Sequence, residues 1–559
     1  MQIVVPMSGF GERFRRAGYT IPKPLIEIDG KPIIAHVIDL FPGETDFIFI
    51  CNQEHLNEPA YRMEAILKEY CPSGRIVGIS PHNLGPINAV LQAEHLLDPI
   101  KPVVVNYCDF ACYWDWNHFI QYVNKLGCIG AIPAYKGFHP HSLGNTNYAY
   151  IREKDGWIHD IQEKQPYTNN RMDEYASSGT YYFASAQTMI NAFRMVIEQD
   201  LNIGGEYYVS LAYKPLFASK QPVAVYLLQH FMQWGTPEDV AEYNTWSKTF
   251  RRLVAHSINS NSTPQGTLVI PMAGLGQRFA KEGYKLPKPL IPVSGLPMVA
   301  QATHDLPSAA QHIFVLRTDM YGYQDVANQL KALYPKAIIK MIDHVTEGQA
   351  CTALIGLDVL EEDNDAEVLT PITIGACDNG ALYDVNAFNS LFNDQSVDVI
   401  VWGIRGYPNA IRNPKMFGWI DAEGSLIHRI SVKTPLDTPS TDPIVLGTFT
   451  FRRSKDFRRA LARLIARNGR INGEFYIDSL INDAIALGMR CCLFEVDSYL
   501  CWGTPNDHRI FEYWQSCFHK WSNHPYRLEL DWRVPKDQVC ILESKYQTVI
   551  PELPKMVAL

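Results

Sequence analysis

The chain has 559 residues, of which 47% are hydrophobic and 19% are charged. Its 50 basic and 59 acidic side chains give a formal net charge of −9 at pH 7. A general nucleic-acid binder or membrane-surface binder needs a basic face, so this balance argues against both classes. The twelve cysteines form no CxxC pair, and we expect them to be small buried hydrophobes in a reducing compartment.

The chain offers no segment that predicts a membrane span or a leader. No window approaches 18 uninterrupted apolar residues, and the opening MQIVVPMSGFGERF has neither a basic leader nor a cleavage site. We therefore expect a cytoplasmic protein without membrane insertion. Its oligomeric state is left open by the sequence.

A long segment near the N-terminus is repeated in the second half of the chain. Residues 3–33, IVVPMSGFGERFRRAGYTIPKPLIEIDGKPI, reappear at 268–298 as LVIPMAGLGQRFAKEGYKLPKPLIPVSGLPM. The later blocks VVVNYCD, GEYYVSLAY and WGTPED reappear in the same order as ITIGACD, GEFYIDSLI and WGTPND. Four matches in one order, at nearly constant spacing, predict a tandem duplication.

The repeat divides the chain into two domains. We place domain one at residues 1–252 and domain two at residues 267–520. Residues 253–266 between them contain a polar stretch rich in Ser, Asn, Gly and Pro, which is typical of a linker. Residues 521–559 have no counterpart after domain one and form a C-terminal extension without an assigned role.

Short apolar runs alternate with helical patterns in domain one. Buried strands are predicted at 2–6, 46–51, 75–80 and 102–107, and amphipathic helices at 33–41, 62–70 and 87–97. Residues 147–164 predict a hairpin turning at Asp155-Gly156, and a strand follows within 177–185. The pattern predicts an α/β fold of two Rossmann-like domains, each a mostly parallel mixed sheet flanked by helices.

Each copy opens with a strand, a glycine-containing loop, an arginine and a Pro-Lys-Pro. The loops are residues 8–13 (SGFGER) and 273–278 (AGLGQR), and ten residues separate the arginine from the lysine in both copies. Glycines directly after a strand let backbone N–H groups approach an anion, and ligands of open α/β sheets bind at the carboxyl ends of strands. The third glycine of a dinucleotide site and the GxxxxGK[ST] of a P-loop do not occur here.

The combination of GxGxRF, the ten-residue spacing and PKPL resembles the sugar-1-phosphate nucleotidylyltransferase (pyrophosphorylase) family. It is most similar to the nucleotidyltransferase modules of bacterial capsule and surface-polysaccharide gene clusters. The blocks VNYCD, IQEKQP, SSGTYYF, GEYY and WGTPED agree with the family in order. The resemblance covers both repeats and implies two GT-A-like domains. It also implies an enzyme that joins a nucleoside triphosphate to a sugar 1-phosphate or similar small phosphate, uses Mg²⁺, releases pyrophosphate and supplies a polysaccharide precursor.

The resemblance implies a role for each matching residue of domain one. Stabilisation of the triphosphate charge falls to Arg13 and Lys23, and contact with the sugar phosphate to Lys164. Expected to lie against the nucleotide or its base are Ser8, Gly9, Gly11, Asn83 and Gly85. Glu163 and Gly179 would face the sugar hydroxyls, and Asp109 would hold Mg²⁺.

Domain two retains most of these residues. The expected catalytic cations are Arg278, Lys288 and Lys433, and the expected metal ligand is Asp378. Gly274, Gly276 and Gly348 match the nucleotide-binding positions, and Gly447 matches the sugar-binding glycine.

Simpler interpretations compete with these roles. Arg13 and Lys23 could be ordinary solvated side chains, Asp109 could cap the next helix, and Glu163-Lys164 could be an exposed strand pair. For Trp234 and Trp502, which precede the two GTP tripeptides, core packing is favoured over ligand stacking.

Two departures from the family pattern bear on activity. Many members carry a second metal-binding aspartate where this chain has Gln233 in domain one and Cys501 in domain two. Glu163 is replaced by Val432, so domain two loses an acidic hydroxyl acceptor. We therefore expect domain one to be active, and domain two to be either a transferase of altered specificity or a degenerate partner.

Two other functions remain open from the sequence. A glycosyltransferase of the related fold would consume a nucleotide sugar, but such enzymes usually show an Asp-x-Asp pair, and CDFAC and CDNGA each offer one aspartate. Alternatively, one or both modules could only sense a nucleotide. Retention of Arg278, Lys288 and Asp378 in the weaker copy counts against full decay.

Overall fold

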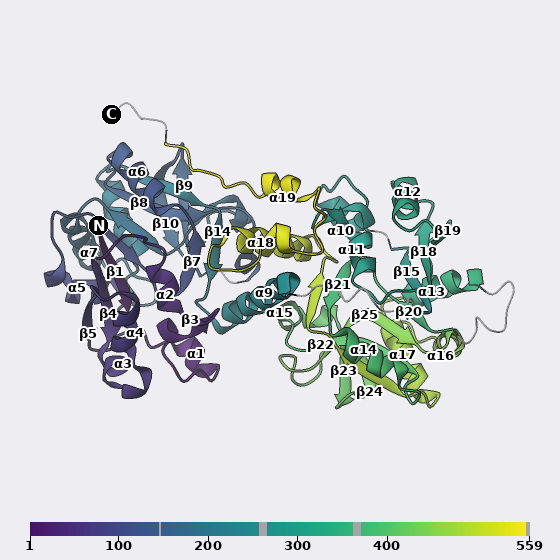
Figure 1. Cartoon of the computed structure of the whole chain (residues 1–559). Helices are drawn as coiled ribbons and strands as arrows, with labels where there is room; N and C mark the ends of the chain where they lie inside the picture. Colours follow the sequence, from purple (N-terminus) through teal and green to yellow (C-terminus); the bar gives the residue numbers. More distant parts are fainter. Residues whose placement is uncertain (145–146, 256–264, 275, 361–369, 555–559) are drawn as a thin grey trace. The chain divides into compact units, whose positions relative to one another are not determined.

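The computed structural model describes residues 1–559 except 145–146, 256–264, 275, 361–369 and 555–559 (Figure 1). Most of the predicted linker and the last residues of the predicted extension thus lie outside the described residues. The chain forms two compact units, Met1–Asn244 with Gln547–Leu559, and Thr245–Tyr546. We call them unit 1 and unit 2.

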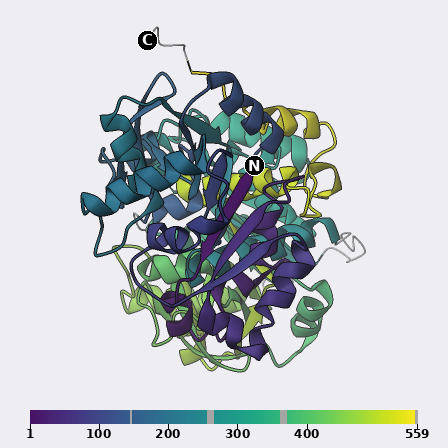
Figure 2. The same ribbon diagram turned by 90° about the vertical axis from the view of Figure 1, so that its left-hand side faces the viewer.

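Unit 1 is built on one large mixed sheet. In spatial order its strands are β11 (Tyr175–Ser177), β9 (Ala149–Lys154), β10 (Trp157–Glu163), β13 (Val223–Leu228), β8 (Gly130–Tyr135), β12 (Thr180–Phe183), β6 (Val103–Asn106), β1 (Gln2–Met7), β4 (Phe47–Asn52) and β5 (Arg75–Ile79). The half formed by β6, β1, β4 and β5 is parallel. These purple and blue strands run side by side in Figure 2. The four strands predicted from apolar runs are therefore confirmed.

Both faces of this sheet are covered. Successive side chains of a strand point to opposite faces, and Ile3, Val4 and Val5 of β1 are all buried. The helices of the unit are α1 (Glu12–Arg16), α2 (Ile33–Ile38), α3 (Gln53–Asn57), α4 (Met63–Tyr70), α5 (Pro86–Gln92), α6 (Trp116–Leu126), α7 (Ala186–Glu198) and α8 (Tyr213–Ala218). One core cluster joins Val4 to apolar residues of α5, α7 and α8. The helices predicted at 33–41, 62–70 and 87–97 correspond to α2, α4 and α5.

The strand predicted within 177–185 is interrupted. Strand β11 ends at Ser177 and β12 begins at Thr180. Gly179 between them has a φ of 96°, a conformation that is accessible to glycine but breaks a strand. The predicted hairpin is present, with β9 and β10 paired across Asp155 and Gly156.

Unit 2 contains a sheet with the same strand order. Its strands are β19 (Ile338–Ile342), β18 (Gln311–Arg317), β15 (Thr267–Met272), β20 (Ile372–Ile374), β25 (Ile444–Phe451), β22 (Val399–Ile404), β26 (Cys491–Glu495), β24 (Leu426–Val432) and β23 (Gly418–Glu423). Its helices are α10 (Gln277–Lys281), α11 (Met298–His304), α12 (Tyr323–Leu333), α13 (Gln349–Leu357), α14 (Val385–Asn393), α15 (Pro408–Arg412), α16 (Ser454–Ala466), α17 (Ile477–Ala486), α18 (Pro505–Lys520) and α19 (Val539–Lys545). The shared order agrees with the duplication expected from the sequence.

Two antiparallel ribbons accompany the large sheets. In unit 1, β7 (Phe110–Tyr113) pairs with β14 (His230–Gln233), and in unit 2, β21 (Asn379–Leu382) pairs with β27 (Ser498–Cys501). Shorter ribbons follow the Pro-Lys-Pro segments, with β2 (Glu27–Ile28) on β3 (Lys31–Pro32) and β16 (Pro292–Val293) on β17 (Leu296–Pro297). The β7 and β21 ribbons bring residues 109 and 233, and likewise 378 and 501, to one place.

Helix α9 (Pro237–Ala255) crosses the position at which the first domain was expected to end. Its residues from Thr245 onward belong to unit 2, where Trp246 and Phe250 pack against Phe511. Burial of these aromatic rings is what assigns the second half of the helix to unit 2.

The C-terminal extension supplies part of the core of unit 2. Arg533 pairs with Asp305 at 3.1 Å, and neither side chain is exposed. The Tyr526 hydroxyl, also buried, donates to Asp531 at 2.8 Å. A buried charge pair is strongly destabilised when one partner is removed, so unit 2 depends on these extension residues.

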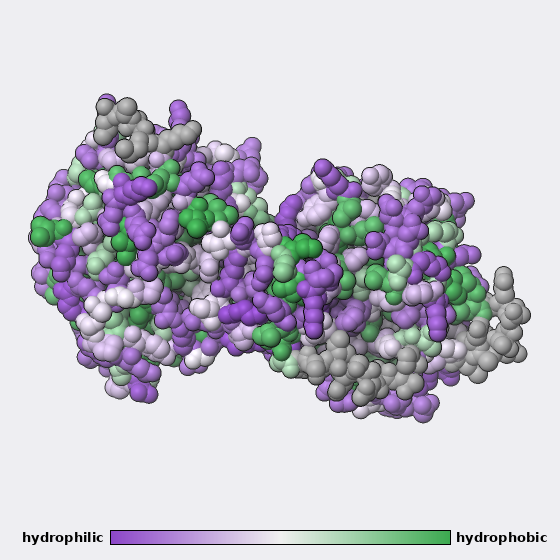
Figure 3. All heavy atoms as spheres, turned by 45° about the horizontal axis from the view of Figure 1, so that its top comes forward, coloured by the Kyte–Doolittle hydropathy of each residue, from purple (hydrophilic) through white to green (hydrophobic). Residues whose placement is uncertain are grey.

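The surface of the described residues is mixed in polarity. On the face drawn in Figure 3, hydrophilic side chains are interleaved with small hydrophobic patches. No helix among the described residues is long and apolar enough to cross a membrane. Nine of the twelve cysteines are buried, as the sequence predicted.

Candidate active site

Lys23 and Asp109 meet at the carboxyl edge of the parallel strands in unit 1. Lys23 begins a 3₁₀ turn in the Pro-Lys-Pro segment, and its Nζ donates to Asp109 Oδ2 at 2.8 Å. Burial acts to lower the pKa of Lys23, but attraction by Asp109 and the hydrogen bond outweigh it and raise the pKa. The amine is therefore held protonated in a partly buried position.

Asp109 follows strand β6 rather than ending it, because β6 stops at Asn106. It does not cap the next helix. That role belongs to Asp115, whose side chain accepts from the backbone N–H of His118 at the start of α6. The carboxylate of Asp109 is thus available to Lys23 and to a ligand.

A cavity of about 400 Å³ collects most of the residues that the sequence marked in domain one. Its lining includes Gly11, Arg13, Lys23, Asp109, Glu163, Lys164 and Gly179. Of the described residues that line it, none is Ser8, Gly9, Asn83 or Gly85. The cavity therefore joins the expected catalytic and sugar-phosphate residues, and leaves the expected base-binding residues outside its lining.

Sequence reasoning missed several residues that line this cavity. They include Tyr107, Asn147, Tyr148, Glu206 and Tyr208. Glu206 and Tyr208 belong to the block GEYY, which is repeated as GEFY in the second half. The repetition was a signal that the block serves the site, although it did not indicate which atoms face the cavity.

Lys164 is held in an unusual backbone conformation. Its φ is 60°, a left-handed value that costs an ordinary residue about 1–2 kcal/mol. Its Nζ donates to the Tyr208 hydroxyl at 2.6 Å and lies 4.5 Å from the centre of that ring, while the hydroxyl donates to Glu206. Strained residues concentrate at functional sites, and here the strain directs the amine into the cavity. Lys164 is thus no ordinary exposed strand residue.

Glu163 stands next to Lys164 at the end of β10. Its Oε2 accepts a hydrogen bond from Ser210 Oγ at 2.6 Å. Burial raises the pKa of Glu163, and the bond from Ser210 and the charge of Lys164 oppose that rise. The carboxylate has a free oxygen that can accept hydrogen bonds from a ligand hydroxyl.

The glycines predicted to bind the nucleotide differ in what surrounds them. Gly85 has a φ of 86°, and a Cβ built on it would lie 2.7 Å from the backbone nitrogen of Tyr207. Gly348 in unit 2 is equally close to the backbone of Phe475. Both glycines are required by a neighbouring segment of the chain. By contrast, a Cβ at Gly9 would meet nothing within 4 Å, so the fold leaves that position open.

Unit 2 repeats the lysine–aspartate pair. Lys288 Nζ donates to Asp378 Oδ2 at 2.5 Å. Beside them lies a cavity of about 870 Å³, whose lining includes Gly274, Gly276, Lys288, Gly348 and Asp378. Among the described lining residues of this larger cavity, Arg278, Lys433 and Gly447 do not occur. The cavity thus extends on the nucleotide side of the predicted site.

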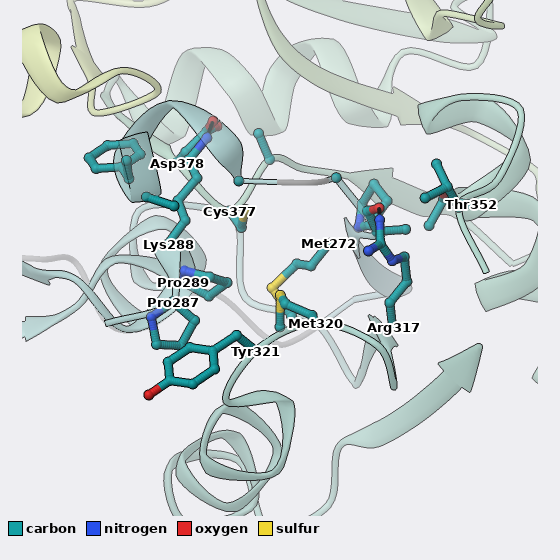
Figure 4. Close-up of a pocket in the computed structure, with 18 of the residues that line it drawn as sticks. Met272, Pro287, Lys288, Pro289, Arg317, Met320, Tyr321, Thr352, Cys377 and Asp378 are labelled. Carbon is teal, nitrogen blue, oxygen red and sulfur yellow. Dashed lines mark hydrogen bonds and ion pairs between the residues drawn. The ribbon is translucent and has the colours of Figure 1, made fainter. Parts of the chain in front are cut away.

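Arg317 has no cationic counterpart in the first repeat, where residue 52 is Asn. Figure 4 shows Lys288 and Asp378 on one side of the cavity in unit 2 and Arg317 with Thr352 on the other. The Arg317 guanidinium donates to the Ala273 carbonyl at 3.0 Å and pairs with Asp319 at 2.7 Å. These contacts fix a cation opposite Lys288.

The position of the missing second carboxylate lies beside the first one in both units. Both side chains approach the same glycine: a Cβ at Gly235 would lie 2.4 Å from Gln233 Nε2 and 3.2 Å from Asp109 Oδ2. An amide oxygen and a carboxylate are hard ligands, and Mg²⁺ is commonly held by one or two such groups together with substrate phosphates. The residues of unit 1 therefore fit Mg²⁺.

Unit 2 fits a hard cation less well. Cys501 occupies the equivalent position, and burial raises the pKa of its thiol far above the ordinary value. A neutral thiol is a poor ligand for Mg²⁺. The other nearby aspartates, Asp239 and Asp507, both interact with the threonine that caps their own helix, Thr236 or Thr504.

Trp234 and Trp502 are packing residues, as predicted. Both are fully buried. Trp234 packs against Tyr243 with ring centres 5.2 Å apart, and Trp502 packs against Phe511 at 5.8 Å. Neither ring lines the cavity of its own unit.

Comparison with known proteins relates unit 1 to one family. Residues 4–202 match the family model described as "Nucleotidyl transferase". The chain is 24% identical over 249 residues to "Mannose-1-phosphate guanylyltransferase catalytic subunit beta" of Danio rerio, covering 43% of this chain and 62% of the relative. It is 24% identical over 247 residues to "Bifunctional protein GlmU" of Methanocaldococcus jannaschii, covering 44% of this chain and 54% of the relative.

Among solved structures, the nucleoside-diphosphate-sugar pyrophosphorylase of Vibrio cholerae RC9 is similar at 19% identity, with a TM-score of 0.36. The match covers 44% of this chain and 99% of that one. The matches to the two curated relatives span less than two thirds of their lengths. Through the family match at residues 4–202 and the similarity to these curated relatives, the chain belongs to the sugar-1-phosphate nucleotidyltransferase family.

Proposed function

We propose that unit 1 transfers a nucleotidyl group from a nucleoside triphosphate to a sugar 1-phosphate or similar small phosphate. The observation that carries this proposal is the convergence of Arg13, Lys23, Lys164, Asp109 and Glu163 on one cavity. Three cations suit two phosphorylated substrates, and one carboxylate beside a lysine suits a hydroxylated acceptor.

The chemistry follows from the positions of these groups. A phosphate oxygen of the acceptor attacks the α-phosphorus of the triphosphate and forms a new P–O bond. The bond from the α-phosphorus to the bridging oxygen breaks, and its electron pair leaves with pyrophosphate. Arg13 and Lys23 would stabilise the charge that grows on the leaving group, since fixed cations at a partly buried site act strongly on a developing anion.

The acceptor would be positioned by the other half of the cavity. Lys164 would bind its phosphate, and Glu163 would accept hydrogen bonds from its hydroxyls. Because Tyr208 and Ser210 hold these two side chains, little rearrangement is needed when the acceptor binds. Gly179 lies in the same lining and leaves room beside them.

Asp109 and the amide oxygen of Gln233 would hold Mg²⁺ together with the substrate phosphates. When bound, the ion would neutralise phosphate charge and orient the reacting groups. Lys23 would then exchange its contact with Asp109 for contact with the triphosphate. We further propose a cytoplasmic enzyme whose product is an activated precursor of a surface polysaccharide.

A glycosyltransferase reaction is a less favourable interpretation of this site. Arg13 and Lys23 both face the region where an extended phosphate chain would lie, and a second carboxylate for the metal is replaced by Gln233. Such cations match the charge of a triphosphate better than that of a diphosphate sugar.

The proposal is tested by pyrophosphate release from the full chain with Mg²⁺. Each of the four ribonucleoside triphosphates and dTTP would be combined with a panel of sugar 1-phosphates and polyol phosphates. We expect release that requires one triphosphate and one acceptor. Absence of release across the panel, with triphosphate binding still measurable by calorimetry, would support a nucleotide sensor instead.

A further inference from the structure

Three positions around Glu163 change together between the two units. In unit 1, Ala149 of β9 pairs with Glu163 of β10, and Ser210 donates to Glu163 at 2.6 Å. In unit 2, Gly418 of β23 pairs with Val432 of β24 at the equivalent place. The residue that matches Ser210 is Asp478, in the repeated block GEFYIDSLI.

The glycine at position 418 is explained by the carboxylate of Asp478. A Cβ built on Gly418 would lie 2.3 Å from Asp478 Oδ2, so an alanine like that of unit 1 would collide with the carboxylate. The backbone of Gly418 does not have a positive φ, so conformation does not require glycine here. Space for Asp478 is the physical reason for the exchange.

The carboxylate of Asp478 has the same charged surroundings as Glu163. Asp478 acts on the pKa values of Lys433 and Tyr476, as Glu163 is acted on by Lys164 and acts on Tyr208. Arg278 contributes at Tyr476 as Arg13 does at Tyr208. Lys433 also shares the left-handed φ of Lys164, at 61° against 60°. The acidic group of the site has moved from a strand to helix α17.

We propose that Asp478 replaces Glu163 as the hydroxyl acceptor of unit 2, and that unit 2 is a second transfer site for a hydroxylated phosphate. This proposal rests on the function proposed for unit 1. It corrects the expectation that the second repeat lacks an acidic hydroxyl acceptor. Burial raises the pKa of Asp478 to about 6, so the group is mostly ionised at neutral pH and able to accept hydrogen bonds.

The side chain approaches from another element, so the acceptor of unit 2 meets its carboxylate in a different orientation. In unit 1 the acid is attached to the strand that ends at Lys164, whereas in unit 2 the strand offers apolar Val432 at that place. A pocket built to pair a substrate hydroxyl discriminates strongly against analogues that lack it. The two units would therefore select different acceptors.

The test uses the full chain with one unit inactivated at a time. Lys23→Ala leaves unit 2 to report, and Lys288→Ala leaves unit 1. Pyrophosphate release would be measured with each nucleoside triphosphate and with sugar 1-phosphates, a pentitol phosphate and glycerol phosphate as acceptors. We expect the Lys23→Ala chain to release pyrophosphate with an acceptor that differs from that of the Lys288→Ala chain.

Asp478 is then tested in the Lys23→Ala chain. Asp478→Asn should raise KM for the acceptor about tenfold or more and change KM for the triphosphate less than about twofold, because a charge-assisted hydrogen bond to the acceptor is lost. Gly418→Ala should produce a similar rise by displacing the carboxylate. In a chain that also carries Asp478→Ser, Gly418→Ala should add nothing. Asp421→Asn, which removes an exposed carboxylate of the same strand β23, is the matched control and should leave both KM values unchanged.

Two results would overturn the inference while the function proposed for unit 1 stands. One is a Lys23→Ala chain that is silent across the panel while the Lys288→Ala chain is active. The other is an acceptor KM unaffected by Asp478→Asn and by Gly418→Ala. Silence of both chains and of the wild type would instead overturn the proposed function, and the inference with it.

Discussion

Lys23 Nζ lies 2.8 Å from Asp109 Oδ2, and Lys288 Nζ lies 2.5 Å from Asp378 Oδ2 at the matching place in the second unit. In each pair a cation expected to bind the triphosphate neutralises the carboxylate expected to bind the metal. The pair stabilises the empty site, because neither charge is left buried alone. A bound triphosphate with its metal would take over both partners.

The first prediction concerns the lysine of this pair. In the proposed reaction Lys23→Ala removes a fixed cation from the leaving group, so turnover by unit 1 should fall about 10²- to 10³-fold. The side chain lies in a loop, and we expect the thermal unfolding midpoint to change little. Lys288→Ala is the matched substitution in unit 2. If pyrophosphate release on the unit 1 acceptor survived Lys23→Ala and was abolished by Lys288→Ala, our assignment of the domains would be wrong.

The second prediction concerns the metal. In the Lys288→Ala chain, Asp109→Asn should raise the Mg²⁺ concentration for half-maximal release, since an ionised ligand is lost. Gln233→Asp should lower that concentration severalfold, because a second carboxylate is added beside Asp109. Both values come from Mg²⁺ titrations of the initial rate. An unchanged titration in both variants would exclude this edge of the sheet as the metal site.

The third prediction separates two glycines to which the sequence assigned the same role. Gly85→Ala should destabilise unit 1 by about 1–3 kcal/mol, because φ is positive and the backbone of Tyr207 occupies the space of the new Cβ. Gly9→Ala meets open space and should leave the free energy of unfolding within about 0.5 kcal/mol while weakening triphosphate binding. Urea unfolding and calorimetry measure the two effects. Equal destabilisation by the two substitutions would contradict this distinction.

The fourth prediction is a pH dependence at Glu163. Burial raises its pKa, and the Ser210 hydrogen bond opposes the rise. A carboxyl with a raised pKa loses its charge as pH falls through that pKa, so acceptor binding should weaken on the acidic side. Ser210→Ala removes the opposing bond and should move the acidic limb of kcat/KM for the acceptor to higher pH. Glu163→Gln should abolish that limb, and a profile unmoved by both substitutions would rule out Glu163 as the acceptor-binding carboxylate.

The sequence by itself determined the features that depend on local pattern. Apolar runs located β1, β4, β5 and β6 within a residue or so, since a strand buried on both faces leaves a continuous apolar signature. Repetition of whole blocks indicated two similar domains. The spacing from Arg13 to Lys23 also placed both cations in one loop region after a strand, where sheet topology puts a ligand.

Contacts between distant segments were decided only by the tertiary structure. Lys23 and Asp109 are 86 residues apart, and nothing in either segment predicted that one would neutralise the other. Gly85 was expected to face a nucleotide, but the backbone of Tyr207 passes close to it. The exchange of Glu163 for Asp478 was invisible in the aligned repeats, because position 432 alone shows a loss. Only strand pairing and the space beside Gly418 reveal the replacement, since register and packing, not spacing along the chain, determine which side chains share a site.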